Sequence, residues 1–281
     1  MIASKKYVDE TLKANNLVAN KSLGQNFLVE SDIAEYIVNS ANITKDTCVI
    51  EIGPGLGALT EFAIKQAGLV KAFEIDNNMV KILTKTFENN DNFVINNIDF
   101  LKVNLLEELN QLIENGYKDI VVLSNLPYYI TSKLLNKMMV NNYPIRCMVT
   151  MMQKEVGQKI LRPEKKDYNL LSIIIDYQYN ASIVKHVGKN SYLPRPEIDS
   201  IVLKFEKVEP RFDVSHKTLV EVSEALLAAR RKTVSNNLKK LFKDASELAD
   251  CLQKCNITSS THVEQLTIND IVNIVKYMEG K

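Results

Sequence analysis

The sequence predicts an α/β fold, a parallel sheet with helices on both faces, followed by a small all-helical domain. Over the first two hundred residues, short apolar runs alternate with amphipathic helical patterns, as in a parallel sheet joined by helices. After residue 205 the strand-like runs stop and helical patterns alone continue. We therefore expect one domain over residues 1–207 and a second over residues 208–281.

The apolar runs of the first domain have the character of buried strands. Residues 120–123 read Ile-Val-Val-Leu, which is apolar on both faces and typical of a central strand covered by helices. The strand candidates are residues 47–51, 70–74, 93–98, 120–124 and 146–151, with a later pair near 177–187 and 200–205. The helical patterns between them include residues 59–66, 78–87 and 105–115.

The second domain is separated by a charged segment, residues 206–213, which contains Pro210 and is expected to be a linker. Thr267 and Ser246 are candidate N-caps of helices that follow it. The helical patterns of this domain are residues 219–229, 233–241, 246–255 and 268–278.

Net charge alone gives no sign of a nucleic-acid partner, because 35 Lys and Arg balance 34 Asp and Glu to leave +1. The distribution is uneven, however, since residues 226–243 contain basic side chains and no acidic ones. Local patches, rather than the total, attract phosphates. This segment is either an RNA-binding surface or a solvated helix face, and its candidate contacts are Arg230, Arg231, Lys232, Lys239 and Lys240.

Membrane and metal partners are not expected. No apolar run reaches the ~20 residues that span a bilayer, and the N-terminus lacks the apolar core of a signal peptide, so a cytoplasmic location is expected. The 4 cysteines and 3 histidines are scattered without paired metal-ligand spacing.

A glycine-rich turn follows the first predicted strand. Gly53, Gly55 and Gly57 let the backbone turn sharply and approach a ligand closely. The helix that starts after them adds unpaired N–H groups and a partial positive charge. Glu74 ends the second strand, where its carboxylate can accept both hydroxyls of a ribose, and Ile75 follows it into the same expected pocket.

This pattern fits more than one cofactor. A glycine turn with an acid about twenty residues on also satisfies the dinucleotide fingerprint. Glu51, directly before the turn, favours a sulfonium-bearing ligand such as S-adenosylmethionine and would be unhelpful beside a pyrophosphate. From these residues, S-adenosylmethionine, a dinucleotide and a purely structural turn all stay open.

The third strand leads into Asp99 and Phe100. A carboxylate at that strand end can accept from the amine of an adenine, and the neighbouring aromatic ring can stack on the base. The alternative is that Asp99 caps the helix near Leu105 or shapes a turn.

The fourth strand runs into Asn125, Leu126, Pro127 and Tyr128. The lone pair of an adenine N6 amine is delocalised, so two acceptors that bind its hydrogens would orient the nitrogen for methylation. The Asn125 side-chain oxygen and the Leu126 carbonyl can be these acceptors, since Pro127 restricts Leu126 to extended backbone. Tyr128 then offers a face for the target base. A Pro-containing loop with aromatics packed in the core is the plainer alternative.

With these motifs in order, the chain resembles the ribosomal RNA adenine N6-dimethyltransferases, in particular their small-subunit (16S) branch. The resemblance covers nearly the whole chain. Its motifs are residues 22–28, 51–57, 125–129, 152–156, 168–172, 193–200 and 230–233.

The resemblance implies a Rossmann-like S-adenosylmethionine-dependent methyltransferase domain without a metal, and a C-terminal domain that grips RNA. It implies that Gln25, Asn26 and Leu28 line the cofactor pocket, with Gly53 at the methionine part. It further implies that Asn125 touches both the cofactor and the target amine. It also implies dimethylation of two adjacent adenosines in the 3′-terminal hairpin of 16S rRNA, within an assembling 30S subunit, by a monomer. Ile98 stands where the family commonly has Gly before the acid.

Three alternatives to this activity remain. The first is a sibling enzyme that methylates an adenine of 23S rRNA and confers macrolide resistance, whose tetrapeptide usually has Ile where this chain has Leu126. The others are a dinucleotide-dependent oxidoreductase and a ribosome assembly factor without catalytic activity.

Overall fold

The structure is a computed structural model that describes residues 1–127, 129–161 and 168–280. Packing divides the chain into two compact units. The first contains Met1–Met138, Tyr143–Gln158 and Ala181–Lys207, and the second contains Met139–Asn142, Lys159–Asn180 and Val208–Lys281. The two units also divide after residue 207, but the second unit additionally includes residues 139–142 and 159–180, which precede the expected boundary.

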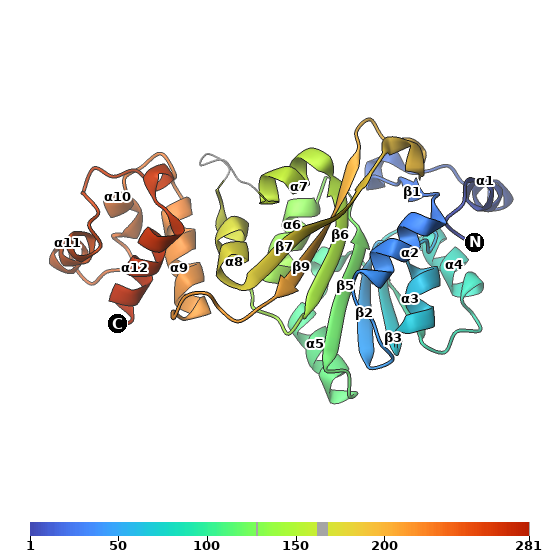
Figure 1. Cartoon of the computed structure of the whole chain (residues 1–281), viewed down its shortest axis with the longest axis horizontal. Helices are drawn as coiled ribbons and strands as arrows, with labels where there is room; N and C mark the ends of the chain where they lie inside the picture. The colour runs from blue at the N-terminus through green and yellow to red at the C-terminus, as the bar shows by residue number, and fades with distance from the viewer. Residues whose placement is uncertain (128, 162–167, 281) are drawn as a thin grey trace. The chain divides into compact units, whose positions relative to one another are not determined.

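The first unit is built on a 7-stranded sheet with the order β4-β3-β2-β5-β6-β9-β7 (Figure 1). Strands β4 to β6 are parallel, as expected, whereas β9 runs antiparallel to β6. Residues 188–199, which lead into β9, contain no α-helix that could make a parallel crossover. The strands are β2 (Thr47–Ile52), β3 (Leu69–Glu74), β4 (Phe93–Asn97), β5 (Asp119–Asn125), β6 (Cys147–Gln153), β7 (Tyr179–Val187) and β9 (Ser200–Lys207).

Helices connect the parallel strands, and three of them match predicted helical patterns: α3 (Thr60–Gln66), α4 (Asn77–Thr86) and α5 (Leu105–Glu114). Side chains fix where two of these begin, because Asp76 accepts from the Asn78 N–H and Asn104 accepts from the Glu107 N–H. Helices that the sequence analysis did not assign are α1 (Lys5–Ala14), α2 (Ser31–Asn39), α6 (Thr131–Met139), α7 (Lys154–Leu161) and α8 (Leu170–Gln178).

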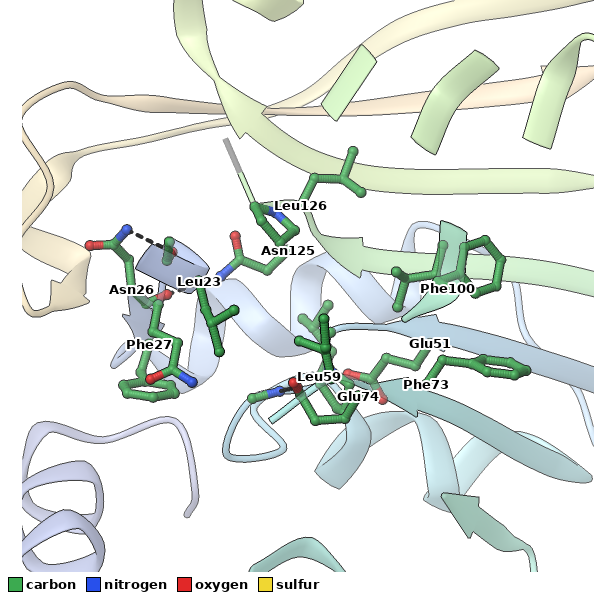
Figure 2. Close-up of a pocket in the computed structure, with 18 of the residues that line it drawn as sticks. Leu23, Asn26, Phe27, Glu51, Leu59, Phe73, Glu74, Phe100, Asn125 and Leu126 are labelled. Atoms are coloured by element: carbon green, nitrogen blue, oxygen red, sulfur yellow. Dashed lines mark hydrogen bonds between the residues drawn. The ribbon is translucent and has the colours of Figure 1, made fainter. Parts of the chain in front are cut away.

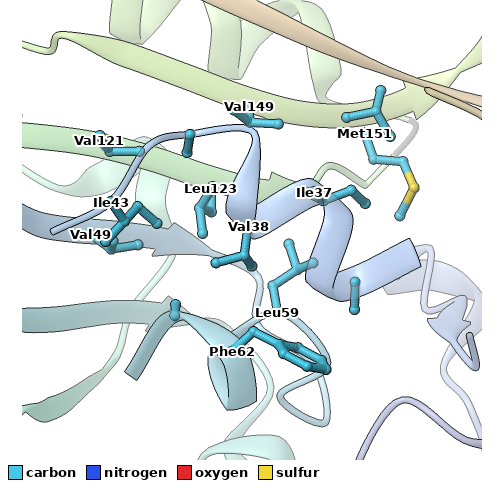
Figure 3. Packing of buried hydrophobic residues seen from close by; sticks show 14 of the residues in the cluster. Ile37, Val38, Ile43, Val49, Leu59, Phe62, Val121, Leu123, Val149 and Met151 are labelled. Atoms are coloured by element: carbon cyan, nitrogen blue, oxygen red, sulfur yellow. The ribbon is translucent and has the colours of Figure 1, made fainter. Parts of the chain in front are cut away.

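One face of the sheet is covered by α2 and the start of α3 (Figure 3). Alternate residues of β2, β5 and β6 point to this face, as strand geometry requires. Their intervening neighbours, such as Ile50 and Val122, are fully buried as well, so both faces are covered. The buried residues labelled in Figure 3 are Ile37, Val38, Ile43, Val49, Leu59, Phe62, Val121, Leu123, Val149 and Met151.

The second unit has a separate helical core. Four C-terminal helices occur where helical patterns were expected: α9 (His216–Leu227), α10 (Val234–Leu238), α11 (Ala245–Lys254) and α12 (Ile268–Met278). Thr267 caps α12 as expected, but Ser246 is not a cap. Asp244 takes that role for α11, because its carboxylate accepts the N–H groups of Ser246 and Glu247.

No helix in the described part of the chain is long and apolar enough to cross a membrane.

Candidate active site

A single pocket of the first unit gathers the residues that the sequence analysis singled out. Parallel pairing puts the carboxyl ends of β2, β3, β4 and β5 at one edge of the sheet, with Ile52 opposite both Phe73 and Ser124. Tyr128 lies outside the described residues. The predicted residues that line the pocket are Gln25, Asn26, Leu28, Glu51, Gly53, Gly55, Glu74, Ile75, Asp99, Phe100, Asn125, Leu126 and Pro127.

The glycine turn at this edge needs glycine for two reasons. Gly53 and Gly55 have φ of 65° and 60°, a conformation that side chains disfavour. A Cβ on Gly53 would meet nothing within 4 Å, so the turn leaves space where the pocket begins. Gly57 also has a positive φ, of 93°, and a Cβ there would lie 2.9 Å from the Phe87 ring.

Glu74 holds the glycine turn from the neighbouring strand. Its carboxylate is 6% exposed and accepts from Gly55 N–H at 3.2 Å and from Asp76 N–H at 2.8 Å. Burial raises the pKa of this carboxyl, and the two backbone hydrogen bonds oppose that rise. Each oxygen accepts one backbone N–H and retains lone pairs for a further donor, such as a ribose hydroxyl.

Glu51 is the second buried carboxyl of the pocket (Figure 2). It is 1% exposed, and its Oε2 accepts from Thr60 Oγ1 at 2.7 Å. Burial raises its pKa to about 7, against the smaller opposing effect of the Thr60 hydrogen bond. A cation bound nearby would favour the ionised form of this carboxyl.

Asp99 and Phe100 lie at the end of β4. Asp99 Oδ1 accepts from Leu101 N–H at 2.9 Å and caps the short 3₁₀ turn η2 (Phe100–Lys102). Asp99 therefore shapes a turn, as one alternative expected. It does not cap the helix near Leu105, because Asn104 caps that helix, α5. Asp99 also lines the pocket, and no described residue donates to its Oδ2. Phe100 packs edge-on against Phe73, with ring centroids 5.2 Å apart.

A loop from the N-terminal part of the chain closes another side of the pocket. Gln25 donates to Asp76 Oδ2 at 2.7 Å and accepts from Asn20 N–H at 2.7 Å. The strand after it, β1 (Phe27–Leu28), pairs antiparallel with β8 (Tyr192–Leu193). These contacts fix the segment that carries Asn26, whose carbonyl accepts from Asn125 at the end of β5.

Asn125 points its amide into this arrangement (Figure 2). Its Nδ2 donates to the Asn26 carbonyl at 3.1 Å, which leaves Oδ1 as an acceptor. Leu126 N–H donates to the Met151 carbonyl at 2.9 Å, and its side chain is buried. Among the described residues, none donates to the Leu126 carbonyl oxygen. Neither acceptor therefore has a donor among the described residues.

Several pocket residues escaped the sequence analysis, chiefly those of the N-terminal segment. Ile2 and Val8 line the pocket, and the Ile2 N–H donates to Glu61 Oε2 at 2.7 Å. Leu23 and Phe27 line it as well. Nothing in the sequence around Ile2 and Val8 distinguishes them from ordinary core residues, because only tertiary packing brings them to the glycine turn. Leu23 and Phe27, in contrast, lie within the motif at residues 22–28.

The basic segment belongs to the second unit, apart from the pocket in the chain. Arg231, Lys232, Lys239 and Lys240 are exposed there. Arg230 is half-buried, and its guanidinium donates to the Tyr168 carbonyl. No cluster of three or more His, Cys, Asp or Glu side chains suited to a metal ion occurs among the described residues.

The chain is similar in sequence to known ribosomal RNA methyltransferases. The family model for ribosomal RNA adenine dimethylase matches residues 16–280. The chain belongs to this methyltransferase family. Ribosomal RNA small subunit methyltransferase A of Clostridium botulinum is 35% identical over 89% of this chain and 90% of its own. The protein of that name from Staphylococcus aureus is 38% identical over 93% of this chain and 89% of its own.

Solved structures support the same fold. A dimethyladenosine transferase from Plasmodium falciparum superposes with a TM-score of 0.70 at 22% identity, covering 90% of this chain and 97% of its own. The 23S rRNA methyltransferase ErmE gives a TM-score of 0.63 at 19% identity, covering 90% of this chain and all of its own. The fold is therefore the Rossmann-like methyltransferase fold with C-terminal helices. The oxidoreductase alternative is set aside because the chain matches the adenine dimethylase family model.

Proposed function

We propose that this protein transfers methyl groups from S-adenosylmethionine to the N6 amines of two adjacent adenosines in the 3′-terminal hairpin of 16S rRNA, in an assembling 30S subunit. Membership of the adenine dimethylase family supports the reaction, and the relatives named for the small subunit support the choice of RNA. The observation that carries the proposal is the orientation of Asn125, whose amide N–H group is engaged by Asn26 while Oδ1 stays available.

The pocket fits S-adenosylmethionine by its chemistry. Glu74 is a buried acceptor for the ribose hydroxyls, and Asp99 Oδ2 can accept from the adenine amine. Gly53 leaves room for the methionine part, with Gln25, Asn26 and Leu28 around it and Gly55 in the same turn. Ile75 and Phe100 supply apolar surface for the adenine, and Glu51 supplies negative charge for a cationic ligand. When bound, S-adenosylmethionine supplies an activated methyl group on a sulfonium.

The chain's own task is then to present the target amine. Asn125 Oδ1 and the Leu126 carbonyl each accept one N6 hydrogen, which orients the nitrogen lone pair. Pro127 keeps the Leu126 carbonyl in place because it has no N–H and restricts the preceding backbone. Its own carbonyl accepts from Ile130 N–H at 3.2 Å and Thr131 Oγ1 at 3.1 Å, which fastens the turn. Tyr128 is proposed as the stacking surface for the base.

The helical domain, residues 208–281, is proposed to bind ribosomal RNA through Arg231, Lys232, Lys239 and Lys240. Their exposure and the absence of acidic residues between positions 226 and 243 support this. Arg230 is proposed to contribute as well, although its guanidinium already donates to Tyr168.

The test uses 30S and 50S particles that lack adenine dimethylation. Each is incubated with the protein and S-adenosylmethionine labelled in the methyl group, and the RNA is digested to nucleosides. The proposal expects labelled N6,N6-dimethyladenosine from the 30S particles alone. Label in 50S particles would favour the 23S activity, and label in neither would favour an assembly factor without catalysis.

A further inference from the structure

Lys137 on α6 belongs to none of the sequence motifs and has no role in the proposed methyl transfer, yet it contacts the proposed adenine side of the pocket. It is half-buried, and its Nζ donates to the Leu101 carbonyl at 3.2 Å and to the Val103 carbonyl at 2.7 Å. The same ammonium lies 6.0 Å from the centroid of the Phe100 ring, within reach of a cation–π interaction. One side chain thus fastens the turn that follows β4.

That turn carries the residues proposed to receive the adenine of the cofactor. The Asp99 side chain caps the turn by accepting from Leu101 N–H, and Lys102 N–H donates to the Asp99 carbonyl at 2.8 Å. These two bonds lie within the turn itself. Besides the packing of Phe100 on Phe73 of β3, Lys137 adds hydrogen bonds from another element, and these help to set where the turn lies relative to the rest of the pocket.

The other end of α6 adjoins the loop proposed to hold the target amine. Thr131, the first residue of the helix, donates to the Pro127 carbonyl, and Leu134 lines the pocket one turn further on. A helix is stiff over this distance, because each N–H is bonded to a carbonyl in the preceding turn. A single rigid element therefore contacts both loops of the pocket.

We propose that Lys137 is a positioning residue for the cofactor: its ammonium holds the turn at 100–103 so that Asp99 and Phe100 meet the adenine of S-adenosylmethionine. This inference rests on the proposed function, because it assumes that an adenosine-containing cofactor binds here. Desolvation lowers the pKa of Lys137, and the nearby Asp99 charge opposes that change. A methionine at this position retains the apolar stem but donates to neither carbonyl.

Calorimetry with S-adenosylhomocysteine tests the proposal. We expect Lys137→Met to weaken binding by about tenfold, the loss of a charge-assisted hydrogen bond. Lys133→Met, an exposed lysine one turn earlier on the same helix, is the matched control and should bind within twofold of the unaltered protein. Equal affinity of both variants would overturn the proposal. Absence of binding by the unaltered protein would instead refute the proposed function.

A double-variant comparison separates positioning from general loss of stability. If Lys137 acts through the adenine turn, Lys137→Met combined with Asp99→Ala should weaken binding by less than the product of the two single effects. Combined with Glu74→Gln, which removes charge at the ribose end, the effects should multiply. Multiplication in both pairs would overturn the proposal, because it would show that Lys137 acts without the Asp99 turn.

Restoring the ammonium gives an independent readout. The native cysteines Cys48, Cys147, Cys251 and Cys255 are all buried, so aminoethylation of a Lys137→Cys variant should be selective. The modified side chain closely matches lysine in length and charge. We expect it to recover at least half of the lost affinity, measured as log Kd. If the aminoethylated variant binds S-adenosylhomocysteine no more tightly than the unmodified Lys137→Cys variant, the proposal is overturned.

Discussion

The pocket at the end of the sheet and the basic segment of the helical unit use polar residues in opposite ways. In the pocket, Glu51 and Glu74 are almost fully buried and each is held by hydrogen bonds from the chain. In the basic segment, four of the five predicted contacts are exposed cations. A buried polar group that loses its hydrogen bonds costs considerable free energy. Exposed charges instead each add a small, salt-screened attraction to a charged partner. Changes in the pocket should therefore be specific and large, and changes in the segment should be graded and salt-dependent.

The largest effect is expected at Asn125. Asn125→Ala removes the proposed acceptor for the target amine and should lower kcat for methyl transfer by about a thousandfold, as loss of a preorganised polar contact does. Since the residue lies at the end of β5, the melting temperature should shift little. Methyl transfer and S-adenosylhomocysteine affinity are measured together, with Asn136→Ala on α6 as a control. Wild-type-like transfer by Asn125→Ala would remove the basis of the proposed mechanism.

Glu74→Ala should mainly affect the cofactor. It deletes the acceptor proposed for both ribose hydroxyls and the bond to Gly55 N–H, so affinity for S-adenosylhomocysteine should fall by about ten- to a hundredfold. Calorimetry measures this directly, and the exposed Glu88→Ala on the segment after α4 is the control. Unchanged affinity would refute the ribose assignment.

Glu51 should make cofactor binding depend on pH. Its pKa in the cofactor-free protein is about 7, so below that value the carboxyl is mostly neutral and attracts a cationic ligand weakly. Affinity for S-adenosylmethionine should rise about fivefold to tenfold from pH 6 to pH 8 and then level off. In Glu51→Gln this rise should disappear. An unchanged pH profile in that variant would assign the titration to another group.

Glu51 should affect the stability of the cofactor-free protein in the opposite direction: affinity for the cofactor rises with pH, whereas stability falls. Because the folded-state pKa lies above that of an unfolded glutamate, Glu51 contributes stability below pH 4.5, and that contribution is lost as pH rises through about 7. At pH 8 the cofactor-free Glu51→Gln protein should therefore melt a few degrees higher than the unaltered protein. A lower melting temperature would show that the buried charge is better compensated than its surroundings indicate.

The smallest effect per residue is expected in the basic segment. Arg231→Glu with Lys240→Glu should weaken binding to 30S particles several-fold and reduce the slope of log K against log salt by about one to two. Arg230 is left intact because it donates to Tyr168. Lys81→Glu with Lys85→Glu, two exposed residues of α4, makes the same change in net charge. An equal effect of both pairs would place the RNA surface elsewhere.

Sequence periodicity predicted most of the sheet, because its strands are apolar enough to stand out. The run at 120–124 became β5, and the turn at residues 53–57 lies where the motif placed it. Helices α2 and α6 were not assigned, although both are amphipathic, since neither is marked by a distinctive motif. The strand at residues 200–205 was predicted and corresponds to β9, but its antiparallel direction was not, because the direction of a strand is decided by its connection and not by its own residues.

The motifs predicted which strand ends meet, but not how the groups at those ends are bonded. The carboxyl ends of parallel strands lie at one edge of a sheet, so Glu74, Asp99 and Asn125 were expected there. The donation from Asn125 to Asn26 joins residues 99 positions apart and has no local signal. Lys137 is hidden for the same reason, since a lysine on a helix face is ordinarily solvated. Ile2 and Val8 depend on N-terminal packing that no periodicity predicts.

The most direct test of the division between cofactor and target acceptors is an experimental structure with S-adenosylhomocysteine and an RNA hairpin that contains two adjacent adenosines. We expect one adenosine turned out of its stack, with N6 within hydrogen-bonding distance of both Asn125 Oδ1 and the Leu126 carbonyl. The cofactor ribose should contact Glu74. A target amine bound at Asp99 or Glu74, with Asn125 Oδ1 turned away from it, would contradict the account.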